Sequence, residues 1–280
     1  MSKLAAAIND SWVGRRFASM PPHVRQKIAS TTPWRDATSF DSSYEEALAA
    51  GGDRTELGKV FFAHKGREIH KWIQYLRAYD EQFGPYRLGF PLPDGSRRPL
   101  RILEIGVAQG GSLQLWREFF GPEAVVFGID IDPRVKAVDD PDLEVRVGSQ
   151  VDPEFLRRVV AEMGGVDIVL DDGSHQARHI RKSFDVLFPL LSDGGLYAVE
   201  DLHAMYWWRF GGGYRRKGTF IEVAKQLTDD MHAWYHSAGD KVGVAAATQI
   251  PKITVYDSIL FIEKSVHGRP IKVRFGQKSF

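Results

Sequence analysis

The sequence contains no cysteine, and its charges nearly cancel. Without thiols, a disulfide, a thiolate metal site and a cysteine nucleophile are all excluded, so any metal must be held by oxygen or nitrogen atoms. The 37 Lys and Arg residues face 36 Asp and Glu residues, which leaves no excess of positive charge to bind a phosphate backbone or an anionic membrane surface. We therefore expect neither nucleic acid nor a membrane as a partner.

Long apolar runs are also lacking. No run is long enough to cross a bilayer, and residues 1–17 show no apolar core followed by a cleavage-like site. These absences predict a cytoplasmic protein that is not exported, in keeping with the lack of cysteine. The chain of 280 residues, 43% of them hydrophobic, is long enough for one substantial core with a smaller appendage.

The composition along the chain predicts an auxiliary, largely helical region at 1–98 and a main domain at 99–280. Residues 1–55 hold several turn-forming Pro and Gly residues, which predict loosely packed turns with one short helix near 44–50. Apolar residues recur every three or four positions over 57–83, which predicts one long amphipathic helix that ends at the following Gly-Pro pair.

Short apolar runs alternate with helical segments in the main domain. Strands are expected at 100–105, 124–129, 143–147, 167–170 and 196–199. Helices are expected at 112–120, 153–163, 177–191 and 219–235. Two final strands, at 253–256 and 259–263, should complete the sheet with one antiparallel strand. The pattern predicts an α/β fold in which helices cover both faces of a doubly wound, mostly parallel sheet.

A glycine-rich loop follows the first predicted strand. It runs from Glu104 through Gly106 and Gly110 to Ser112, so a carboxylate and an approachable backbone lie where the strand turns into a helix. Ala108 stands where the middle glycine of a G-x-G-x-x-G dinucleotide loop would be. A carboxylate repels a pyrophosphate but attracts the ammonium and sulfonium groups of S-adenosylmethionine. The loop therefore favours S-adenosylmethionine over a nicotinamide dinucleotide.

Polar residues after the next strands extend this predicted cofactor site. Asp130, twenty residues beyond Gly110, can accept hydrogen bonds from both ribose hydroxyls. Gln150 could reach the adenine edge, and Asp171, at the end of the fourth strand, is expected next to the cofactor. The alternative is an ordinary Gly-rich turn followed by a solvated Asp-Pro turn.

Two pairs of acids follow neighbouring strands: Asp171 with Asp172, and Glu200 with Asp201. Because the carboxyl ends of parallel strands meet at one edge, all four carboxylates would crowd one crevice. Left unpaired they would repel one another, and a shared cation removes that repulsion. Oxygen ligands favour a hard ion such as Mg²⁺, with Mn²⁺ or Ca²⁺ as substitutes. The alternative is a turn with a capped helix and a solvated strand end.

Two histidines near these acids are candidate bases. A neutral imidazole beside a metal could take up a proton near pH 7, which makes His175 the first candidate and His203 the second. A buried histidine with only a hydrogen-bonding role is the alternative. His179, four residues beyond His175, lacks the intervening glutamate of an H-E-x-x-H motif, and we interpret it as structural.

An aromatic and basic segment, 205–217, follows the second acidic pair and contains three consecutive glycines. A glycine hinge at the place where an acceptor must enter predicts a lid. Trp207 or Trp208 could stack on a sugar or an aromatic ring, although packing in the core is the alternative for at least one of them.

Six motifs between residues 57 and 264 point to one enzyme family. They are Lys65-Gly66 with His70-Lys71-Trp72, and residues 103–112, 128–132, 170–175, 199–203 and 256–259. With these motifs the chain resembles the bacterial natural-product O-methyltransferases typified by the mycinamicin and rhamnosyl sugar methyltransferases. The cephamycin and catechol O-methyltransferases are more distantly similar. The combination of Asp-Asp-Gly-Ser-His with Glu-Asp-Leu-His is the specific part of this resemblance.

The resemblance implies a class I methyltransferase fold with S-adenosylmethionine and Mg²⁺ or Mn²⁺. It implies that the metal is bound by acids after strands four and five, namely Asp171 or Asp172, Glu200 and Asp201. It also implies that His175 is the base.

The reaction we expect is methylation of a hydroxyl on a small molecule, a deoxysugar or glycosylated natural product of antibiotic biosynthesis. An aromatic, catechol-like or polyketide hydroxyl is an alternative acceptor. A nicotinamide-dependent oxidoreductase and a noncatalytic cofactor-binding module are the alternatives to a methyltransferase, and assembly into a homo-oligomer is a further hypothesis.

Overall fold

The computed structural model describes residues 42–139, 142–237, 248–277 and 279. The chain divides into two compact units, one ending at Ala50 and the other beginning at Gly51. In the first unit the described part contains helix α4 (Tyr44–Ala49), whose start is closed by a capping box between Ser43 and Glu46. This helix was predicted. The other turns predicted before residue 42 lie outside the described residues.

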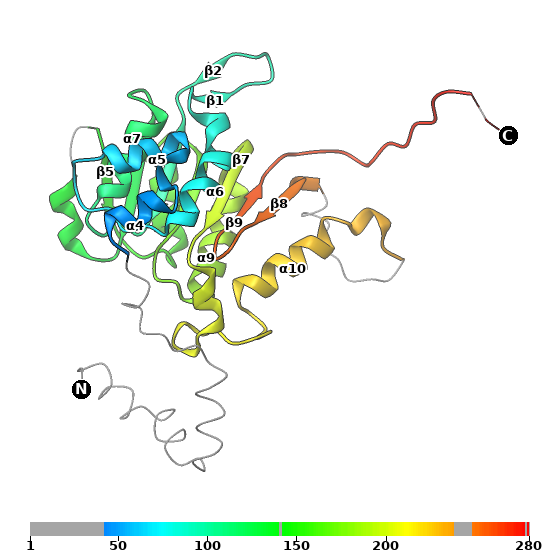
Figure 1. Ribbon diagram of the computed structural model, residues 1–280. Helices are drawn as coiled ribbons and strands as arrows, with labels where there is room; N and C mark the ends of the chain where they lie inside the picture. Colours follow the sequence, from blue (N-terminus) through cyan, green and yellow to red (C-terminus); the bar gives the residue numbers. More distant parts are fainter. Residues whose placement is uncertain (1–41, 140–141, 238–247, 278, 280) are drawn as a thin grey trace, which may run out of the picture. The chain divides into compact units, whose positions relative to one another are not determined.

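The second unit is built on a seven-stranded sheet (Figure 1). Its strands are β3 (Arg101–Ile105), β4 (Val125–Asp130), β5 (Glu144–Val147), β6 (Val166–Asp171), β7 (Leu191–Val199), β8 (Lys252–Val255) and β9 (Leu260–Glu263). They lie in the order β5-β4-β3-β6-β7-β9-β8, and the neighbours from β5 to β7 are parallel. Strand β9 runs antiparallel to β7 and β8. The predicted mostly parallel sheet with one antiparallel strand is confirmed.

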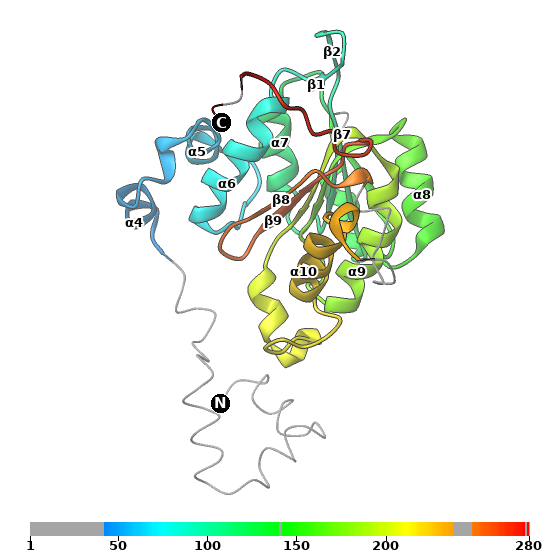
Figure 2. The same ribbon diagram turned by 90° about the vertical axis from the view of Figure 1, so that its right-hand side faces the viewer.

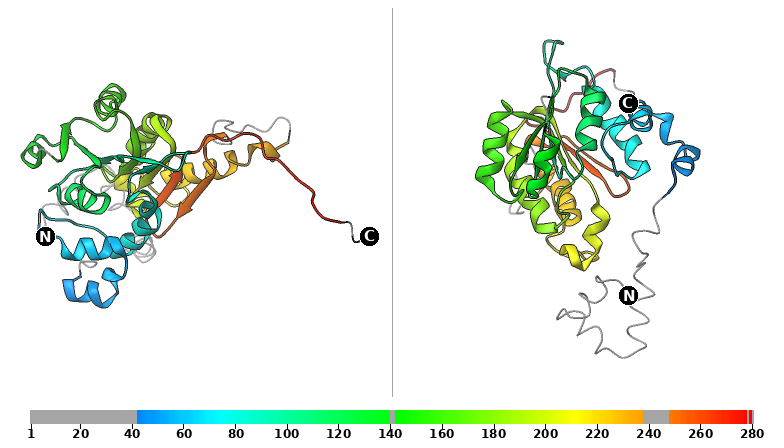
Figure 3. Two further views of the ribbon diagram at one scale, coloured as in Figure 1. Left: turned by 90° about the horizontal axis from the view of Figure 1, so that it is seen from above. Right: turned by 90° about the vertical axis from the view of Figure 1, so that its left-hand side faces the viewer.

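Helices cover both faces of this sheet, as Figure 2 shows. One apolar cluster joins the sheet to α5 (Glu56–Ala63), α6 (Ile73–Phe83) and α7 (Gly111–Phe120). A second joins it to α8 (Pro153–Glu162), α9 (Ala177–Leu187) and α10 (Phe220–Asp230). Successive residues of β3 contribute to opposite clusters, Ile102 to the first and Leu103 to the second, because side chains alternate along a strand. The doubly wound arrangement is confirmed, and Figure 3 gives two further views of it.

Most element boundaries agree with the predictions to within a few residues, but the long helix predicted over 57–83 is wrong. Helix α5 ends at Ala63, α6 begins only at Ile73, and the chain between them, 64–72, crosses from one helix to the other without helical structure. The apolar spacing is genuine, but it belongs to two helices that share one apolar cluster.

The sequence around Gly66 explains the break. A Cβ atom at Gly66 would lie 2.2 Å from Oε1 of Gln114 on α7, so a larger residue there would require that side chain to move. The same oxygen accepts a hydrogen bond of 2.8 Å from the backbone N–H of Arg67. His64, whose ψ of 135° is not helical, places its Nε2 3.1 Å from the carbonyl of Arg67. Side chains thus replace the backbone hydrogen bonds that a continuous helix would have supplied.

A buried carboxylate connects the strands at the amino-terminal end of the sheet. Asp167, which is fully buried on β6, accepts hydrogen bonds from Nη2 of Arg98 at 2.6 Å and from Nη2 of Arg101 at 2.8 Å. The hydroxyl of Ser192 on β7 donates a third, at 2.6 Å. Burial disfavours the ionised carboxyl, but the two guanidinium groups and the hydroxyl outweigh it and hold the pKa of Asp167 below its ordinary value.

Helices α5 and α6 share the core of the sheet, so residues 51–98 lie in the same compact unit as 99–280. The division of roles at residue 98 stays a prediction. Within the described residues, no helix combines the length and the apolar character that a bilayer-spanning helix needs.

Candidate active site

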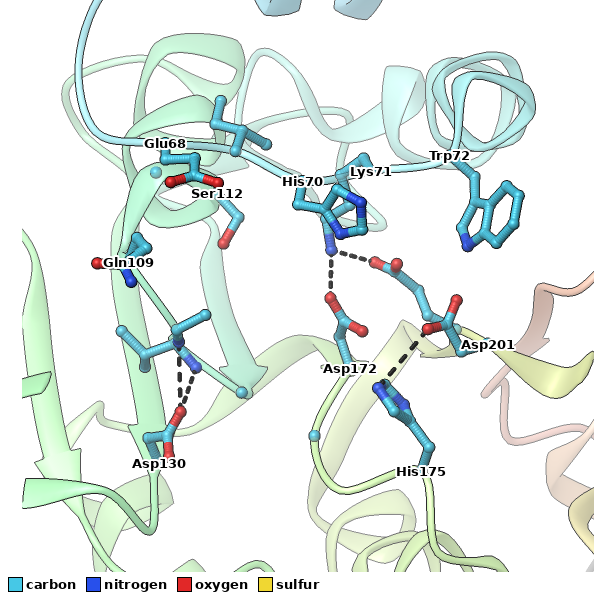
Figure 4. Close-up of a pocket in the computed structure, with 17 residues that line it drawn as sticks. Glu68, His70, Lys71, Trp72, Gln109, Ser112, Asp130, Asp172, His175 and Asp201 are labelled. Atoms are coloured by element: carbon cyan, nitrogen blue, oxygen red, sulfur yellow. Dashed lines mark hydrogen bonds and ion pairs between the residues drawn. The ribbon is translucent and has the colours of Figure 1, made fainter. Parts of the chain in front are cut away.

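A cavity of about 450 Å³ lies at the carboxyl-terminal edge of the sheet (Figure 4). Its wall contains residues 68–72 of the crossing segment, most of the loop 106–112, and residues at the ends of β4, β6 and β7. Figure 4 shows the crossing segment running over the cavity, from the glycine loop on one side to Asp201 on the other. Five acids and one lysine line the cavity, namely Glu68, Asp130, Asp172, Glu200, Asp201 and Lys71.

The glycine loop and Asp130 form one half of the cavity. Gly106 has φ of 98°, and a Cβ there would lie 2.2 Å from the carbonyl oxygen of Asp172, so the loop requires glycine at this position. Oδ2 of Asp130 accepts hydrogen bonds from the backbone N–H groups of Val107, at 2.9 Å, and Ala108, at 3.3 Å. The acid therefore holds the loop in place while its carboxylate faces the cavity. Three predicted cofactor residues, Gly106, Ser112 and Asp130, are brought together here.

Glu104 lies behind this wall rather than in it, with 1% of its surface exposed. Its Oε2 accepts hydrogen bonds from Ser112 Oγ, at 2.8 Å, and from Trp116 Nε1, at 3.2 Å. Among the described residues its Oε1 has no hydrogen-bond partner, and Nζ of Lys71 is 3.6 Å away. Burial raises the pKa of Glu104 to about 7, against the opposing effect of the Lys71 ammonium. Gly110, with φ of 79°, precedes α7 and is likewise outside the cavity wall.

The structure places Gln150 and Asp171 outside the wall of this cavity, and the cofactor contacts predicted for both and the metal contact predicted for Asp171 stay predictions. The side chain of Gln150 donates to Oδ1 of Asp171 at 3.1 Å and accepts from the backbone of Ser174 at 2.9 Å. The hydroxyls of Ser183 and Tyr197 donate to Oδ2 of Asp171 at 2.9 and 3.2 Å.

The physical reason lies in the alternation of side chains along β6. Asp171 faces the α9 side of the sheet, where neutral donors satisfy it and burial raises its pKa. Asp172, one residue on, lines the cavity. Of the two aspartates that the sequence left open, Asp172 is the one in position to meet a metal.

Asp172, His175 and Asp201 form the other half of the cavity. Each offers one ligand atom, and these atoms all lie within 4.8 Å of one another. Nε2 of His175 is 3.6 Å from Oδ2 of Asp201, and the hydroxyl of Tyr75 donates to Oδ1 of Asp201 at 2.9 Å. Two carboxylates and one imidazole at this spacing could surround a small cation.

Glu200, the fourth predicted metal ligand, is bound by two residues that sequence reasoning did not assign to the site. It accepts hydrogen bonds from Nζ of Lys71, at 2.5 Å, and from the hydroxyl of Tyr79. Lys71 also donates to Oδ2 of Asp172 at 2.6 Å. Burial and the nearby Asp172 raise the pKa of Glu200, while the ammonium of Lys71 opposes that rise.

The surroundings of Lys71 favour its charged form. Burial favours its neutral form, but the carboxylates of Asp172, Glu200 and Glu104 outweigh that effect and raise the pKa of Lys71 well above its ordinary value. The sequence feature that could have assigned Lys71 to the site was its place in the motif His70-Lys71-Trp72. The prediction of a continuous helix over 57–83 placed this motif on a helix and not at the site. Its partner Tyr79 carried no signal beyond an apolar position on α6.

The two candidate bases differ in position. His175 lines the cavity, whereas His203 lies outside the cavity wall, with its Nδ1 2.5 Å from the hydroxyl of Ser258. The ring of His203 contacts Trp72 edge to face at a centroid distance of 5.5 Å, and burial lowers its pKa. His179 hydrogen-bonds the hydroxyl of Ser174 through Nδ1 at 2.9 Å, in keeping with the structural role predicted for it.

Four residues at this edge of the sheet have left-handed backbone angles although none is glycine. Their φ values are 47° for Ala108, 53° for His175, 53° for Asp201 and 66° for Ser258. Such conformations cost about 1–3 kcal/mol each and persist where the surrounding structure imposes them. They turn the chain in the loops that follow β3, β6, β7 and β8, and all of them except Ser258 line the cavity.

The segment predicted as a lid begins with two short helices, η6 (Leu202–Tyr206) and η7 (Trp208–Phe210). The rings of Trp207 and Phe210 stack at 6.1 Å, and the guanidinium of Arg209 lies over both. Phe210 also contacts His175 edge to face at 6.0 Å, so this segment reaches the cavity. The lid itself stays a prediction.

Comparison with known proteins shows that the chain is similar to methyltransferases. A family of methyltransferase domains matches residues 103–202. The 8-demethyl-8-alpha-L-rhamnosyl tetracenomycin-C 2'-O-methyltransferase of Streptomyces olivaceus is 32% identical over 277 residues, which are 91% of this chain and 70% of that protein. The 8-demethyl-8-(2-methoxy-alpha-L-rhamnosyl)-tetracenomycin-C 3'-O-methyltransferase of the same organism is 33% identical over 244 residues, 83% of this chain and 60% of that protein.

A solved structure of a methyltransferase is also similar to this chain. The MycE methyltransferase from the mycinamycin biosynthetic pathway, in complex with Mg, SAH and mycinamycin VI, matches with a TM-score of 0.62 and 31% identity. The match covers 89% of this chain and 62% of that one. The chain thus spans less than two thirds of MycE and of the 3'-O-methyltransferase.

Proposed function

The chain belongs to the family of natural-product sugar O-methyltransferases represented by the rhamnosyl tetracenomycin-C enzyme, as its motifs predicted, and on that premise we propose its reaction. It moves a methyl group from S-adenosylmethionine to a sugar hydroxyl of a glycosylated small molecule, with the help of a divalent cation. The class I methyltransferase fold is confirmed by the sheet order and by the MycE match.

One observation carries the proposal. The glycine loop with Asp130 and the group of Asp172, His175 and Asp201 line opposite sides of a single cavity (Figure 4). A donor bound on the first side would have its reactive methyl group directed at an acceptor held on the second.

The residues present fit both groups that the reaction needs. Asp130 offers a carboxylate to the ribose hydroxyls, and the backbone at Gly106 leaves room for the donor. Mg²⁺ prefers oxygen ligands, so Asp172 and Asp201 would hold it, with Glu200 as a third acid. That choice leaves the imidazole of His175 for proton transfer. When bound, the cation supplies positive charge that lowers the pKa of a nearby hydroxyl.

The side chains then divide the work. His175 takes the proton of the acceptor hydroxyl at Nε2, the oxygen forms a bond to the methyl carbon, and the bond between that carbon and sulfur breaks. Asp201, 3.6 Å from this nitrogen, stabilises the imidazolium that results. Tyr75 fixes the orientation of Asp201 through its hydrogen bond. The aromatic segment around Trp207 and Phe210 covers the acceptor and excludes water.

The test is calorimetric and chemical. We expect S-adenosylmethionine to bind the purified protein, and methyl transfer to a rhamnosylated aromatic polyketide or macrolide to require Mg²⁺ and to stop with EDTA. The methylated oxygen is located by NMR of the product. Absence of cofactor binding would refute the methyltransferase, and transfer that continues in EDTA would refute the role of the cation.

A further inference from the structure

Lys71 is a buried cation at the place where the acids of the site meet. Its Nζ lies 2.6 Å from Asp172, 2.5 Å from Glu200 and 3.6 Å from Glu104, and only 3% of its side chain is exposed. Glu104 is on β3, Asp172 follows β6 and Glu200 follows β7, which are adjacent strands. One ammonium group therefore links three strands at the edge where the cavity lies, and Figure 4 shows its bond to Asp172.

This ammonium does not balance the cluster. Of the described residues that line the cavity, Lys71 is the only lysine or arginine, and it faces the carboxylates of Glu104, Asp172 and Glu200. Asp201 lies next in the same wall. Uncompensated carboxylates at short range repel one another, so the cluster can accept more positive charge than one lysine supplies.

Glu200, predicted as a metal ligand, contacts Lys71 and does not join the other candidate ligand atoms. The group of ligand atoms that lie within 4.8 Å of one another comprises Asp172, His175 and Asp201, without Glu200. Glu200 is held by Lys71 and by the hydroxyl of Tyr79. The lysine thus pairs with two of the proposed metal ligands, Glu200 and Asp172.

We infer that Lys71 is a resident counter-ion of the acidic cluster, and that a divalent cation displaces its ammonium from Glu200 and Asp172 when it binds. The inference rests on the proposed function, because it assumes a divalent cation at this site. The ammonium and the metal ion bind the same carboxylates and so compete for them. Before the metal arrives, Lys71 reduces the repulsion among the acids.

The displaced ammonium of Lys71 can pair with Glu104. Oε1 of Glu104 lacks a hydrogen-bond partner among the described residues and is 3.6 Å from Nζ. A shift of about 1 Å brings the two atoms to hydrogen-bond distance. Lys71 can therefore release two acids to the metal and pair with the third, so the exchange leaves no buried charge unpaired.

The exchange also connects the metal to the wall of the cavity. Lys71 belongs to the crossing segment, whose residues 68–72 line the cavity. Its neighbour Trp72 packs against His203. Moving the lysine side chain removes contacts between the crossing segment and the ends of β6 and β7. Metal binding therefore changes the affinity for any ligand that packs on this segment. By thermodynamic linkage, that ligand changes the affinity for the metal by the same factor.

The test is the affinity for Mn²⁺, measured by the electron paramagnetic resonance signal of the free ion. In Lys71→Met no ammonium has to be displaced, so we expect the dissociation constant to fall about tenfold or more relative to the wild type. Lys71→Arg, which retains a competing cation, should bind Mn²⁺ no more tightly than the wild type. The midpoint of thermal unfolding of Lys71→Met should be lower than that of the wild type without metal and should rise more when Mn²⁺ is added.

Lys264→Met is the matched control. Lys264 is 8% exposed and donates to the backbone carbonyls of Pro189 and Leu191, at 2.7 Å each, with no carboxylate among these partners. The change removes a buried lysine from another part of the same unit. We expect it to lower the unfolding midpoint and to leave Mn²⁺ affinity unchanged.

Equal or weaker Mn²⁺ binding by Lys71→Met overturns the inference but leaves the proposed function intact. Absence of Mn²⁺ binding in both proteins overturns the inference together with the proposed cation, while cofactor binding still tests the methyltransferase separately. If Lys71→Met does not fold, hydrogen exchange of the wild type decides. Amide exchange over 64–72 should quicken when Mn²⁺ binds, and an unchanged rate overturns the inference.

Discussion

The two ends of strand β6 carry carboxylate clusters of opposite character. Near its beginning, Asp167 meets two guanidinium groups, those of Arg98 and Arg101, so positive charge exceeds negative. Just after its end, Asp172 shares a single ammonium, that of Lys71, with other acids. Among the described residues, the first cluster has more cationic groups than carboxylates and connects strands, whereas the second has fewer cationic groups than carboxylates and is the one that opens on a cavity.

The comparison shows how to separate structural acids from functional ones. Both Asp167 and Asp172 would look alike in the sequence, as aspartates at the ends of one buried strand. What separates them is the charge balance of their partners. Neutralising Asp167 should cost stability and leave activity unchanged, and neutralising an acid at the other end should do the reverse.

The largest effect should come from Asp201→Asn. The change removes a carboxylate that faces both the proposed metal and His175, and losing several kcal/mol of transition-state stabilisation lowers kcat by about 10³-fold or more. The amide oxygen can still accept the hydrogen bond of Tyr75, so the free energy of unfolding should change by less than about 1 kcal/mol. Steady-state kinetics and urea unfolding measure the two quantities, and a variant that keeps wild-type turnover contradicts the site assignment.

Asp167→Asn should have the next largest effect, at the other end of the strand. It leaves two guanidinium groups without their carboxylate, which we expect to lower the unfolding free energy by about 2–4 kcal/mol. This cost is smaller than the roughly 3–5 kcal/mol of a broken buried pair, because both arginines are partly solvated. The value of kcat/KM should stay at the wild-type level. A loss of activity without a loss of stability would contradict the proposal that the Asp167 cluster is structural and the Asp172 cluster functional.

Changing His175 sharpens the functional side of the comparison. His175→Ala should lower kcat by about 10²-fold, the lower end of what a general base contributes, with cofactor affinity retained. His179→Ala, which changes a histidine on α9 that is bonded to Ser174, is the control and should keep near-normal kcat. Equal losses in the two variants would show that His175 is not the base.

The smallest effect concerns pH and stability at the Asp167 end. Because the folded protein lowers the pKa of this carboxyl below its value in the unfolded chain, the ionised group stabilises the fold above that unfolded value. The contribution is lost as the pH falls through the folded pKa. The difference in unfolding free energy between wild type and Asp167→Asn should therefore narrow below about pH 4. Urea unfolding at several pH values measures it, and a constant difference contradicts the argument.

Much of the fold could be predicted because it depends on local patterns. Apolar runs of strand length separated by amphipathic helices predicted each of the central strands, and the two short runs at 253–256 and 259–263 predicted the antiparallel one. The break between α5 and α6 could not be predicted in this way. It depends on Gln114, distant in sequence from Gly66 and Arg67, which takes over the hydrogen bonding of the crossing segment.

The site was predicted in outline but not in its partners. Motif positions identified Asp130, Asp172, His175 and Asp201, which do line one cavity. Whether Asp171 or Asp172 faces it depends on which side of the sheet each side chain points to, and that requires the strand register. The pairing of Lys71 with Glu200 joins residues 129 positions apart and follows only once the chain crosses the sheet edge.

The turns around the cavity are of two kinds, and this difference bears on how new acceptors can arise within the family. His175 and Asp201 have strained backbone angles that place their side chains in the cavity wall, and the surrounding structure imposes these angles. The segment after them bends at Gly211 and Gly213, with φ of 76° and 155°, which glycine adopts without strain, and it also contains Arg215 with φ of 55°. We therefore expect divergence to reshape the segment with these glycines, which we predict to cover the acceptor, and to spare the turns that hold His175 and Asp201, to which we assign the methyl transfer.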